Sequence, residues 1–195
     1  MKRLDCLKLL APMVDPHMLT VTSLSSNTAF WSDLRREGAS FFGCNMGLCI
    51  PFALGLTAAF PKRKVIALDS DGSLMNDTSS LITVADVNPA NFVAIVMDNG
   101  SYARMGSTFT TRKTDLEKIA QGAGITNTIT VRTEEAFSAA ARQALESAGP
   151  HFIVAKVEPD RVRVKGDPHR TYGRFMREMF VDAVRRHPDY QQARK

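Results

Sequence analysis

The feature that most constrains this fold is the stretch of residues 64–102, which has the pattern of a strand, a loop, a helix and a strand. Residues 65–68 are apolar, rich in branched side chains and too few for a helix, so they predict a buried strand. Residues 92–97 predict a second buried strand. A helix is predicted between them over residues 74–87, from the spacing of Leu74, Leu81, Ile82, Ala85 and Val87. Two strands joined through a helix favour a parallel pair.

Polar, turn-forming residues follow each of these two strands. Asp71, Gly72 and Ser73 follow the first strand, and residues 98–101 follow the second. The carboxyl ends of parallel strands meet at one edge of a sheet, where open α/β sheets bind ligands. Asp71 and Asn99 would bring a carboxylate and an amide oxygen to this edge, and both suit Mg²⁺. The backbone N–H groups of Gly72 and Ser73, at the start of the helix, suit a diphosphate.

These two loops resemble the cofactor motif of the thiamine diphosphate enzymes, in which Gly-Asp-Gly is followed further along the chain by Asn-Asn. The resemblance implies that Asp71 and Asn99 bind Mg²⁺ through their side chains and that Ser101 binds it through its carbonyl. It also places Gly72, Ser73 and Tyr102 at the cofactor. Two residues depart from the family pattern, and neither stands at a metal-ligand position. They are Ser70, in place of Gly, and Asp98, in place of Asn.

A second part of the resemblance lies upstream, where residues 42–47, Phe-Gly-Cys-Asn-Met-Gly, resemble the family's Gly-Ser-Met-Gly, which places Gly43, Cys44, Met46 and Gly47 at the cofactor. The resemblance implies that Met46 supports the bent cofactor by apolar contact. It also implies that the Cys44 carbonyl receives the amino group of the pyrimidine ring. An isolated Asp-Gly-Ser is usually a turn and a lone Met usually packs in a core, so the interpretation depends on the order and spacing of the motifs. A dinucleotide site is disfavoured because no Gly-x-Gly-x-x-Gly follows a predicted strand.

The rest of the chain continues the alternation of strands and helices. Further strands are predicted at residues 19–23, 40–43, 127–132 and 152–157, and helices at 2–10, 28–35, 48–60, 114–122 and 133–148. The helix at 48–60 is apolar almost all round, which predicts burial. A final helix has an apolar stripe that would pack on the sheet or on a partner, made of Tyr172, Phe175, Met176, Met179, Phe180, Ala183 and Val184. The pattern predicts one α/β domain over residues 1–195, a three-layer sandwich with a mostly parallel central sheet flanked by helices.

Composition narrows the classes of function. No apolar run approaches the roughly 20 residues that span a bilayer, and the first residues have no signal-peptide core, so no membrane association is expected. Three cysteines without Cys-x-x-Cys spacing predict free thiols and a cytoplasmic location. The net charge of +5 includes many C-terminal arginines, but no nucleic-acid motif accompanies them. A solvated helix face is therefore expected there, and no nucleic-acid partner.

Over nearly its whole length the chain resembles the separately encoded small, or beta, subunits of sulfopyruvate and phosphonopyruvate decarboxylases. The resemblance implies the diphosphate- and Mg²⁺-binding subunit of a split carboxy-lyase that acts on a small 2-oxo acid with thiamine diphosphate as electron sink. No catalytic residue is expected in this chain, because the family takes a Glu from a pyrimidine-binding domain. That domain would belong to a separate alpha subunit, in a hetero-oligomer of paired heterodimers.

Some questions of function stay open at this point. Arg104, Arg112 and Lys113 follow the second motif and could meet an anionic substrate or be surface charges. The chain could instead be a non-catalytic, regulatory cofactor-binding subunit. It could also belong to a carboligase that resembles acetolactate synthase. The sequence does not identify the 2-oxo acid.

Overall fold

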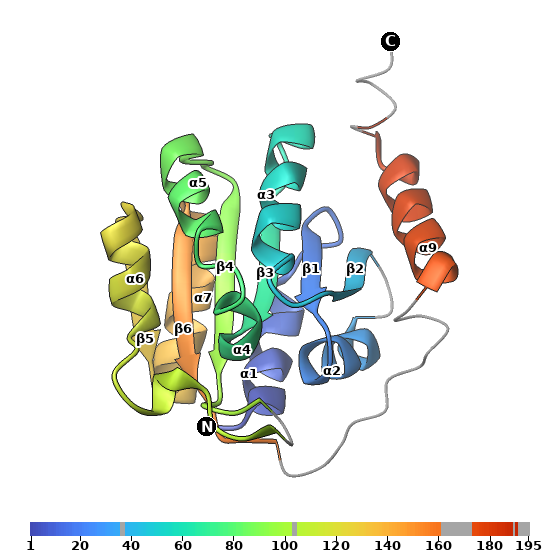
Figure 1. Ribbon diagram of the computed structural model, residues 1–195. Helices are drawn as coiled ribbons and strands as arrows, with labels where there is room; N and C mark the ends of the chain where they lie inside the picture. The colour runs from blue at the N-terminus through green and yellow to red at the C-terminus, as the bar shows by residue number, and fades with distance from the viewer. Residues whose placement is uncertain (36–37, 103–104, 161–172, 189, 191–195) are drawn as a thin grey trace.

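A parallel sheet forms the centre of the structure, a computed structural model that describes residues 1–35, 38–102, 105–160, 173–188 and 190 (Figure 1). The described residues form one six-stranded sheet in the order β2-β1-β3-β4-β6-β5. Each neighbouring pair is parallel, so the predicted fold class is confirmed and the sheet is parallel throughout. The strands are β1 (Leu19–Ser23), β2 (Ala39–Cys44), β3 (Val65–Ser70), β4 (Phe92–Asp98), β5 (Asn127–Val131) and β6 (His151–Lys156).

Helices cover both faces of the sheet and complete a three-layer sandwich (Figure 1). One face carries α1 (Arg3–Leu10), α2 (Ser26–Leu34) and α7 (Glu134–Glu146), and the other carries α3 (Cys49–Ala59), α5 (Ser80–Val87) and α6 (Leu116–Ala123). Two separate cores result, because successive strand residues point to opposite faces. In β3, Val65 and Ala67 belong to the core beneath α3, whereas Ile66 and Leu68 belong to the core beneath α1 and α7.

The helix predicted over residues 74–87 is wrong, because the chain forms two helices there. A single turn, α4 (Asp71–Leu74), is separated from α5 by a short polar turn. The Asn76 side chain donates to the Gly72 carbonyl at 2.8 Å, and the Asp77 carboxylate accepts from the Ser80 N–H at 3.2 Å. Asn and Asp side chains compete in this way with helical hydrogen bonds. Ile82 and Val87, two of the apolar residues whose spacing predicts the helix, are 62% and 53% exposed.

Two other helices are less buried than the sequence suggested. In α3, Cys49, Ile50 and Ala53 are buried, but Phe52 is 36% exposed, so the helix is not buried all round as predicted. The C-terminal helix α9 (Gly173–Arg186) packs on the sheet through part of its stripe, and the ring of Phe180 lies 5.5 Å from that of Phe41 in β2. Met176 and Val184 are buried with it. Phe175 and Met179 are exposed, and Tyr172 lies outside the described residues.

Other expectations concern the surface and the thiols. Within the described ranges, no helix has the length and apolar character that a membrane crossing requires. The three cysteines are free thiols, as predicted, and all three are buried. Several of the C-terminal basic residues lie outside the part of the chain that the structure describes, namely Arg161, Arg163, Lys165 and Arg170.

Candidate functional site

The predicted site residues gather at the carboxyl edge of the sheet. Ser70 is the register partner of Met97, so Asp71 and Asp98 leave β3 and β4 at the same level. Figure 1 shows α4 and the segment that follows β4 at this one end of the sheet. That segment includes a 3₁₀ turn, η3 (Phe109–Thr111). The topology therefore brings together the two loops that the sequence singled out.

Asp71 is buried at this edge, and its two carboxyl oxygens have different surroundings. Oδ2 accepts hydrogen bonds from the Thr108 hydroxyl at 2.6 Å and from the Thr110 hydroxyl at 3.3 Å. Oδ1 is buried and has no hydrogen-bond partner among the described residues. A buried carboxylate oxygen without a partner is costly. A bound ligand could therefore supply the missing partner of Asp71 Oδ1.

Electrostatics also favour a cation at Asp71. Burial raises the pKa of its carboxyl, the hydrogen bond from Thr108 acts against this rise, and the nearby Asp98 carboxylate adds to it. Burial raises the pKa of the neighbouring Asp69 to about 6, although the side chain of Ser73 and the N–H of Ser70 donate to it. A bound cation would favour the charged form of these acids.

Two contacts join the loops to one another. The Gly47 N–H donates to the Ser73 hydroxyl at 3.2 Å, which links the loop after β2 to α4. The ring of Tyr102 lies against Gly72, where a Cβ atom would stand 2.7 Å from ring atom Cε1. A side chain at position 72 would therefore displace the Tyr102 ring. The Met46 loop, α4 and the segment after β4 form one cluster.

The upstream motif borders the same edge. Met46 is 41% exposed, so its side chain is available to a ligand or a partner. Gly47, with φ of 82°, has the left-handed backbone that favours glycine. Gly43 donates from its N–H to the Thr28 hydroxyl at 2.7 Å. The Cys44 carbonyl accepts from the Leu24 N–H at 2.9 Å, and its second lone pair could still receive a pyrimidine amino group.

Asn99 and Ser101 form the turn that follows Asp98. The Asn99 amide oxygen accepts from the Ser101 N–H at 3.0 Å, which leaves one lone pair for a metal ion. The described residues contain no group of three or more His, Cys, Asp or Glu that could hold a metal, whereas the predicted site asks for a single carboxylate. The free Asp71 oxygen, an amide oxygen and a backbone carbonyl form a hard-oxygen donor set that fits Mg²⁺.

Sequence reasoning missed four side chains at this edge. Thr108 and Thr110 contact Asp71, and Lys156 forms an ion pair with the buried carboxylate of Asp98. The only signal for the threonines was their concentration in residues 108–111, directly after the motif. The fourth is Asn27, whose side-chain amide donates to the carbonyls of Leu68 and Asp69 and so holds the end of β3.

The cationic residues predicted to meet a substrate are placed only in part. Arg112 and Lys113 are exposed and directly follow η3, the turn in which Thr110 contacts Asp71. Arg104 lies outside the described residues. The role of Arg112 and Lys113 stays a prediction.

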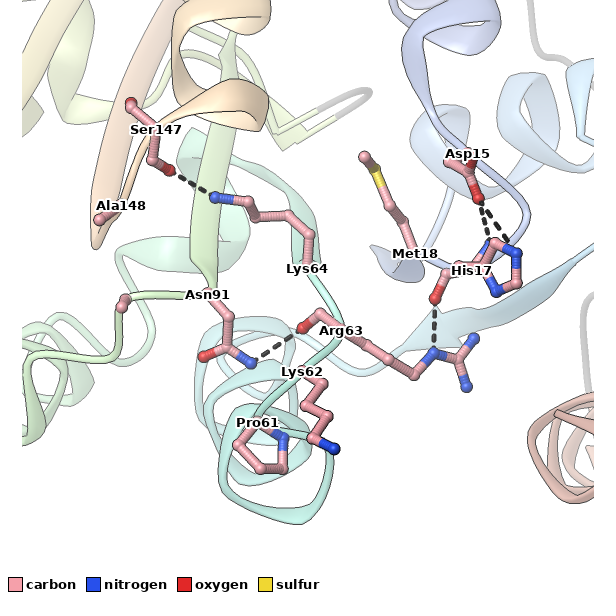
Figure 2. A pocket seen from close by; sticks show the side chains of 11 residues that line it. Asp15, His17, Met18, Pro61, Lys62, Arg63, Lys64, Asn91, Ser147 and Ala148 are labelled. Atoms are coloured by element: carbon pink, nitrogen blue, oxygen red, sulfur yellow. Dashed lines mark hydrogen bonds and ion pairs between the residues drawn. The ribbon is translucent and has the colours of Figure 1, made fainter. Parts of the chain in front are cut away.

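A cavity of about 570 Å³ lies at the opposite, amino-terminal edge of the sheet, and it contains none of the predicted site residues (Figure 2). Its polar groups bond one another across the strand starts. Lys64 donates to the Ser147 carbonyl at 2.6 Å, Arg63 donates to the His17 carbonyl at 2.5 Å, and Asn91 donates to the Arg63 carbonyl at 2.8 Å. The cavity is therefore separate from the carboxyl-edge cluster.

Known proteins resemble this chain over most of its length. Residues 28–155 match the family described as thiamine pyrophosphate enzyme, C-terminal TPP binding domain. The beta subunit of sulfopyruvate decarboxylase from Methanocaldococcus jannaschii is 33% identical over 162 residues, which cover 81% of this chain and 85% of that one. Sulfopyruvate decarboxylase from Methanosarcina acetivorans is 33% identical over 86% of this chain and 44% of its own length. The solved thiamine diphosphate-dependent 4-hydroxybenzoylformate decarboxylase of Rhodococcus jostii RHA1 is 26% identical, with a TM-score of 0.67 over 83% of this chain and 33% of that chain.

Proposed function

The chain belongs to the thiamine pyrophosphate enzymes through their C-terminal TPP binding domain, and we propose that it is the diphosphate- and Mg²⁺-binding subunit of a split 2-oxo acid decarboxylase. The family, the thiamine diphosphate cofactor and the lyase class predicted from the sequence are confirmed by the comparisons. The site residues and Mg²⁺ stay predictions. The observation that carries them is the buried, unpartnered Oδ1 of Asp71 at the carboxyl edge of the sheet.

The residues of this chain would bind and orient the cofactor. Asp71, with Asn99 and the Ser101 carbonyl, would hold Mg²⁺, which would neutralise negative charge on the diphosphate. Gly72 and Ser73 would donate backbone N–H groups to diphosphate oxygens. Because α4 is a single turn, the backbone N–H groups at its start would contribute more than a helix dipole does. Thiamine diphosphate supplies the electron sink for loss of CO₂ from a 2-oxo acid.

The exposed Met46 would contact the middle of the cofactor, and the pyrimidine end would then project beyond this chain. A separate pyrimidine-binding subunit would cover that end and supply the catalytic Glu. The two kinds of sulfopyruvate decarboxylase relative support this arrangement. This chain covers most of the one named a beta subunit but under half of the one named without a subunit. A hetero-oligomer of paired heterodimers would then form the enzyme.

The substrate that the relatives favour is a small 2-oxo acid with a second acidic group. Sulfopyruvate is named for the relatives from M. jannaschii and M. acetivorans. Exposed Arg112 and Lys113 would lie close enough to the Asp71 edge to attract such an anion.

The proposal is tested by reconstitution. The chain is assayed alone and together with a separately encoded pyrimidine-binding subunit, with Mg²⁺, thiamine diphosphate and a panel of 2-oxo acids. CO₂ release is expected only when both subunits are present. Analysis of the organic product separates decarboxylation from carboligation. Sustained turnover by this chain alone would refute the split-enzyme assignment, and a complex that binds the cofactor without turnover would favour the regulatory alternative.

A further inference from the structure

We propose that Asp98, Thr110 and Lys156, together called the Asp98 network, position Asp71 for the metal ion. The inference rests on the proposed function, because it assigns a role at the same cofactor site. None of the three is proposed to touch the metal or the substrate. They would act through Asp71 by fixing which of its oxygens is free.

The hydroxyls of Thr108 and Thr110 connect the two acidic side chains. Thr110 Oγ1 lies 2.8 Å from Asp98 Oδ1 and 3.3 Å from Asp71 Oδ2. Thr108 Oγ1 lies 2.6 Å from Asp71 Oδ2 and 2.8 Å from Thr110 Oγ1. The carboxylates of Asp71 and Asp98 are therefore held close together through two threonines that lie on one short segment.

Each hydroxyl has a single proton to donate, and this decides the pattern of bonds. The shortest contact of Thr108 is to Asp71, and that of Thr110 to a carboxylate is to Asp98. In this pattern Thr108 donates to Asp71 Oδ2 and Thr110 donates to Asp98 Oδ1. Thr110, held by Asp98, stands 2.8 Å from the Thr108 hydroxyl and limits by contact where that hydroxyl can lie. The other Asp71 oxygen, Oδ1, is left without a protein donor and is available to a cation.

Lys156 stabilises the negative charge of Asp98 in its buried position. The Asp98 side chain is 2% exposed, and Lys156 Nζ forms an ion pair with its Oδ2 while remaining 25% exposed. The two residues are register partners at the ends of β4 and β6, so the sheet itself sets their separation. Without Lys156, the buried Asp98 carboxylate would stand beside Asp71 without its ion-pair partner, and removing one partner of a buried pair is strongly unfavourable.

The ion pair also accounts for a departure from the family pattern. The thiamine diphosphate motif that this chain resembles has Asn where Asp98 stands. An Asn at this position could accept from Thr110 without needing a cation. In this chain Asp98 and Lys156 form a pair of opposite charges. If residue 98 is neutral, Lys156 should no longer be needed to position Asp71 for the metal ion.

The test compares Lys156→Met, Asp98→Asn, the double variant and Thr110→Val in the full-length chain. Mg²⁺ is titrated by calorimetry in the presence of thiamine diphosphate. Exchange of the Thr108 amide hydrogen, which donates to the Gly100 carbonyl at 2.9 Å, is followed without metal or cofactor. Lys118→Met and Thr83→Val are the matched controls, because both residues are exposed and lie on helices, α6 and α5, that contribute no residue to the network. Thermal unfolding of each metal-free variant records any general loss of stability.

Lys156→Met and Thr110→Val are expected to weaken Mg²⁺ binding about 10- to 100-fold, as outer-shell changes at metal sites do, and to speed exchange at Thr108. Asp98→Asn should lose less Mg²⁺ affinity than Lys156→Met does, and adding it to Lys156→Met should recover most of that variant's loss. Unchanged Mg²⁺ affinity in Lys156→Met, or no recovery in the double variant, would overturn the inference. Failure of the wild-type titration alone would instead overturn the proposed cofactor site on which the inference rests.

Discussion

Asp71 is the residue on which the proposed site most depends, because only one of its carboxyl oxygens is held by protein hydroxyls. Asp71→Ala is expected to abolish Mg²⁺-dependent binding of thiamine diphosphate, measured by calorimetry with and without the metal. The unfolding temperature of the metal-free chain should not fall much, since burial and Asp98 already disfavour the Asp71 charge.

Asp86→Ala is the matched control for that experiment. Asp86 is an exposed carboxylate on α5, outside the cluster at the carboxyl edge. The Asp86→Ala variant should bind Mg²⁺ and thiamine diphosphate as the wild type does. Wild-type affinity in Asp71→Ala would show that the metal site lies elsewhere.

Met46 is predicted to act by shape and not by charge. Met46→Leu nearly conserves volume, so it should cost less than about 1.5 kcal/mol of unfolding free energy and keep most activity in the assembled enzyme. Met46→Gly should lose turnover while the chain still folds, because a side chain that is 41% exposed adds little to the core. Parallel measurements of turnover and thermal unfolding separate these effects. Normal turnover in Met46→Gly would make Met46 an ordinary surface residue.

At the scale of elements, α9 offers a direct comparison between two phenylalanines on one helix. Phe180 is buried against Phe41 of β2, whereas Phe175 is 55% exposed. Phe180→Ala should lower the free energy of unfolding by about 3 kcal/mol through the lost burial and the cavity it leaves. Phe175→Ala should change it by less than about 0.5 kcal/mol. Chemical denaturation measures both, and equal effects would mean that α9 does not dock on β2 as described.

The break between α4 and α5 also belongs to this scale. Hydrogen bonds from Asn76 and to Asp77 end the first turn and start the next helix. The short α4 thereby remains at the ends of β3 and β4, where Gly72 meets Tyr102 and Ser73 meets Gly47. A continuous helix over residues 74–87 would show the same apolar spacing in the sequence. The spacing alone therefore could not predict the break.

At the scale of the whole molecule, burial shifts pKa values at both edges of the sheet: it lowers that of His151 at the amino edge and raises those of Asp69 and Asp71 at the carboxyl edge. His151 lies at the amino edge, and burial, with a contribution from Lys64, lowers its pKa below the ordinary 6.5. The folded state then binds fewer protons than the unfolded state, so this stabilisation is present above the unfolded pKa and is lost as pH falls below it.

His151→Gln should therefore lose less unfolding free energy than the wild type between about pH 7.5 and about pH 5.5. Chemical denaturation at the two pH values gives this difference. The raised pKa values of Asp69 and Asp71 act in the opposite direction, but they are common to both proteins and cancel in the comparison. Identical pH dependence in the two proteins would show that His151 does not titrate with folding.

The amino-acid sequence by itself determined the α/β class, the six strands of the described sheet and the positions of the cofactor motifs, because these depend on short-range patterns. Apolar runs such as residues 65–68 define strands locally, and Asp-Gly-Ser must turn wherever it follows one. A single domain over residues 1–195 and the metal-ligand set stay predictions.

Only the tertiary structure decided which side chains meet. Thr108 and Thr110 contact Asp71 across a long loop, and Lys156 reaches Asp98 because β6 pairs with β4. It also decided which apolar residues remain exposed, such as Ile82 on α5 and Phe175 on α9. Strand order and helix docking bring together residues far apart in the chain, and no local pattern of spacing or propensity encodes those meetings. The free oxygen of Asp71 depends on such contacts, so it could be located only in the folded chain.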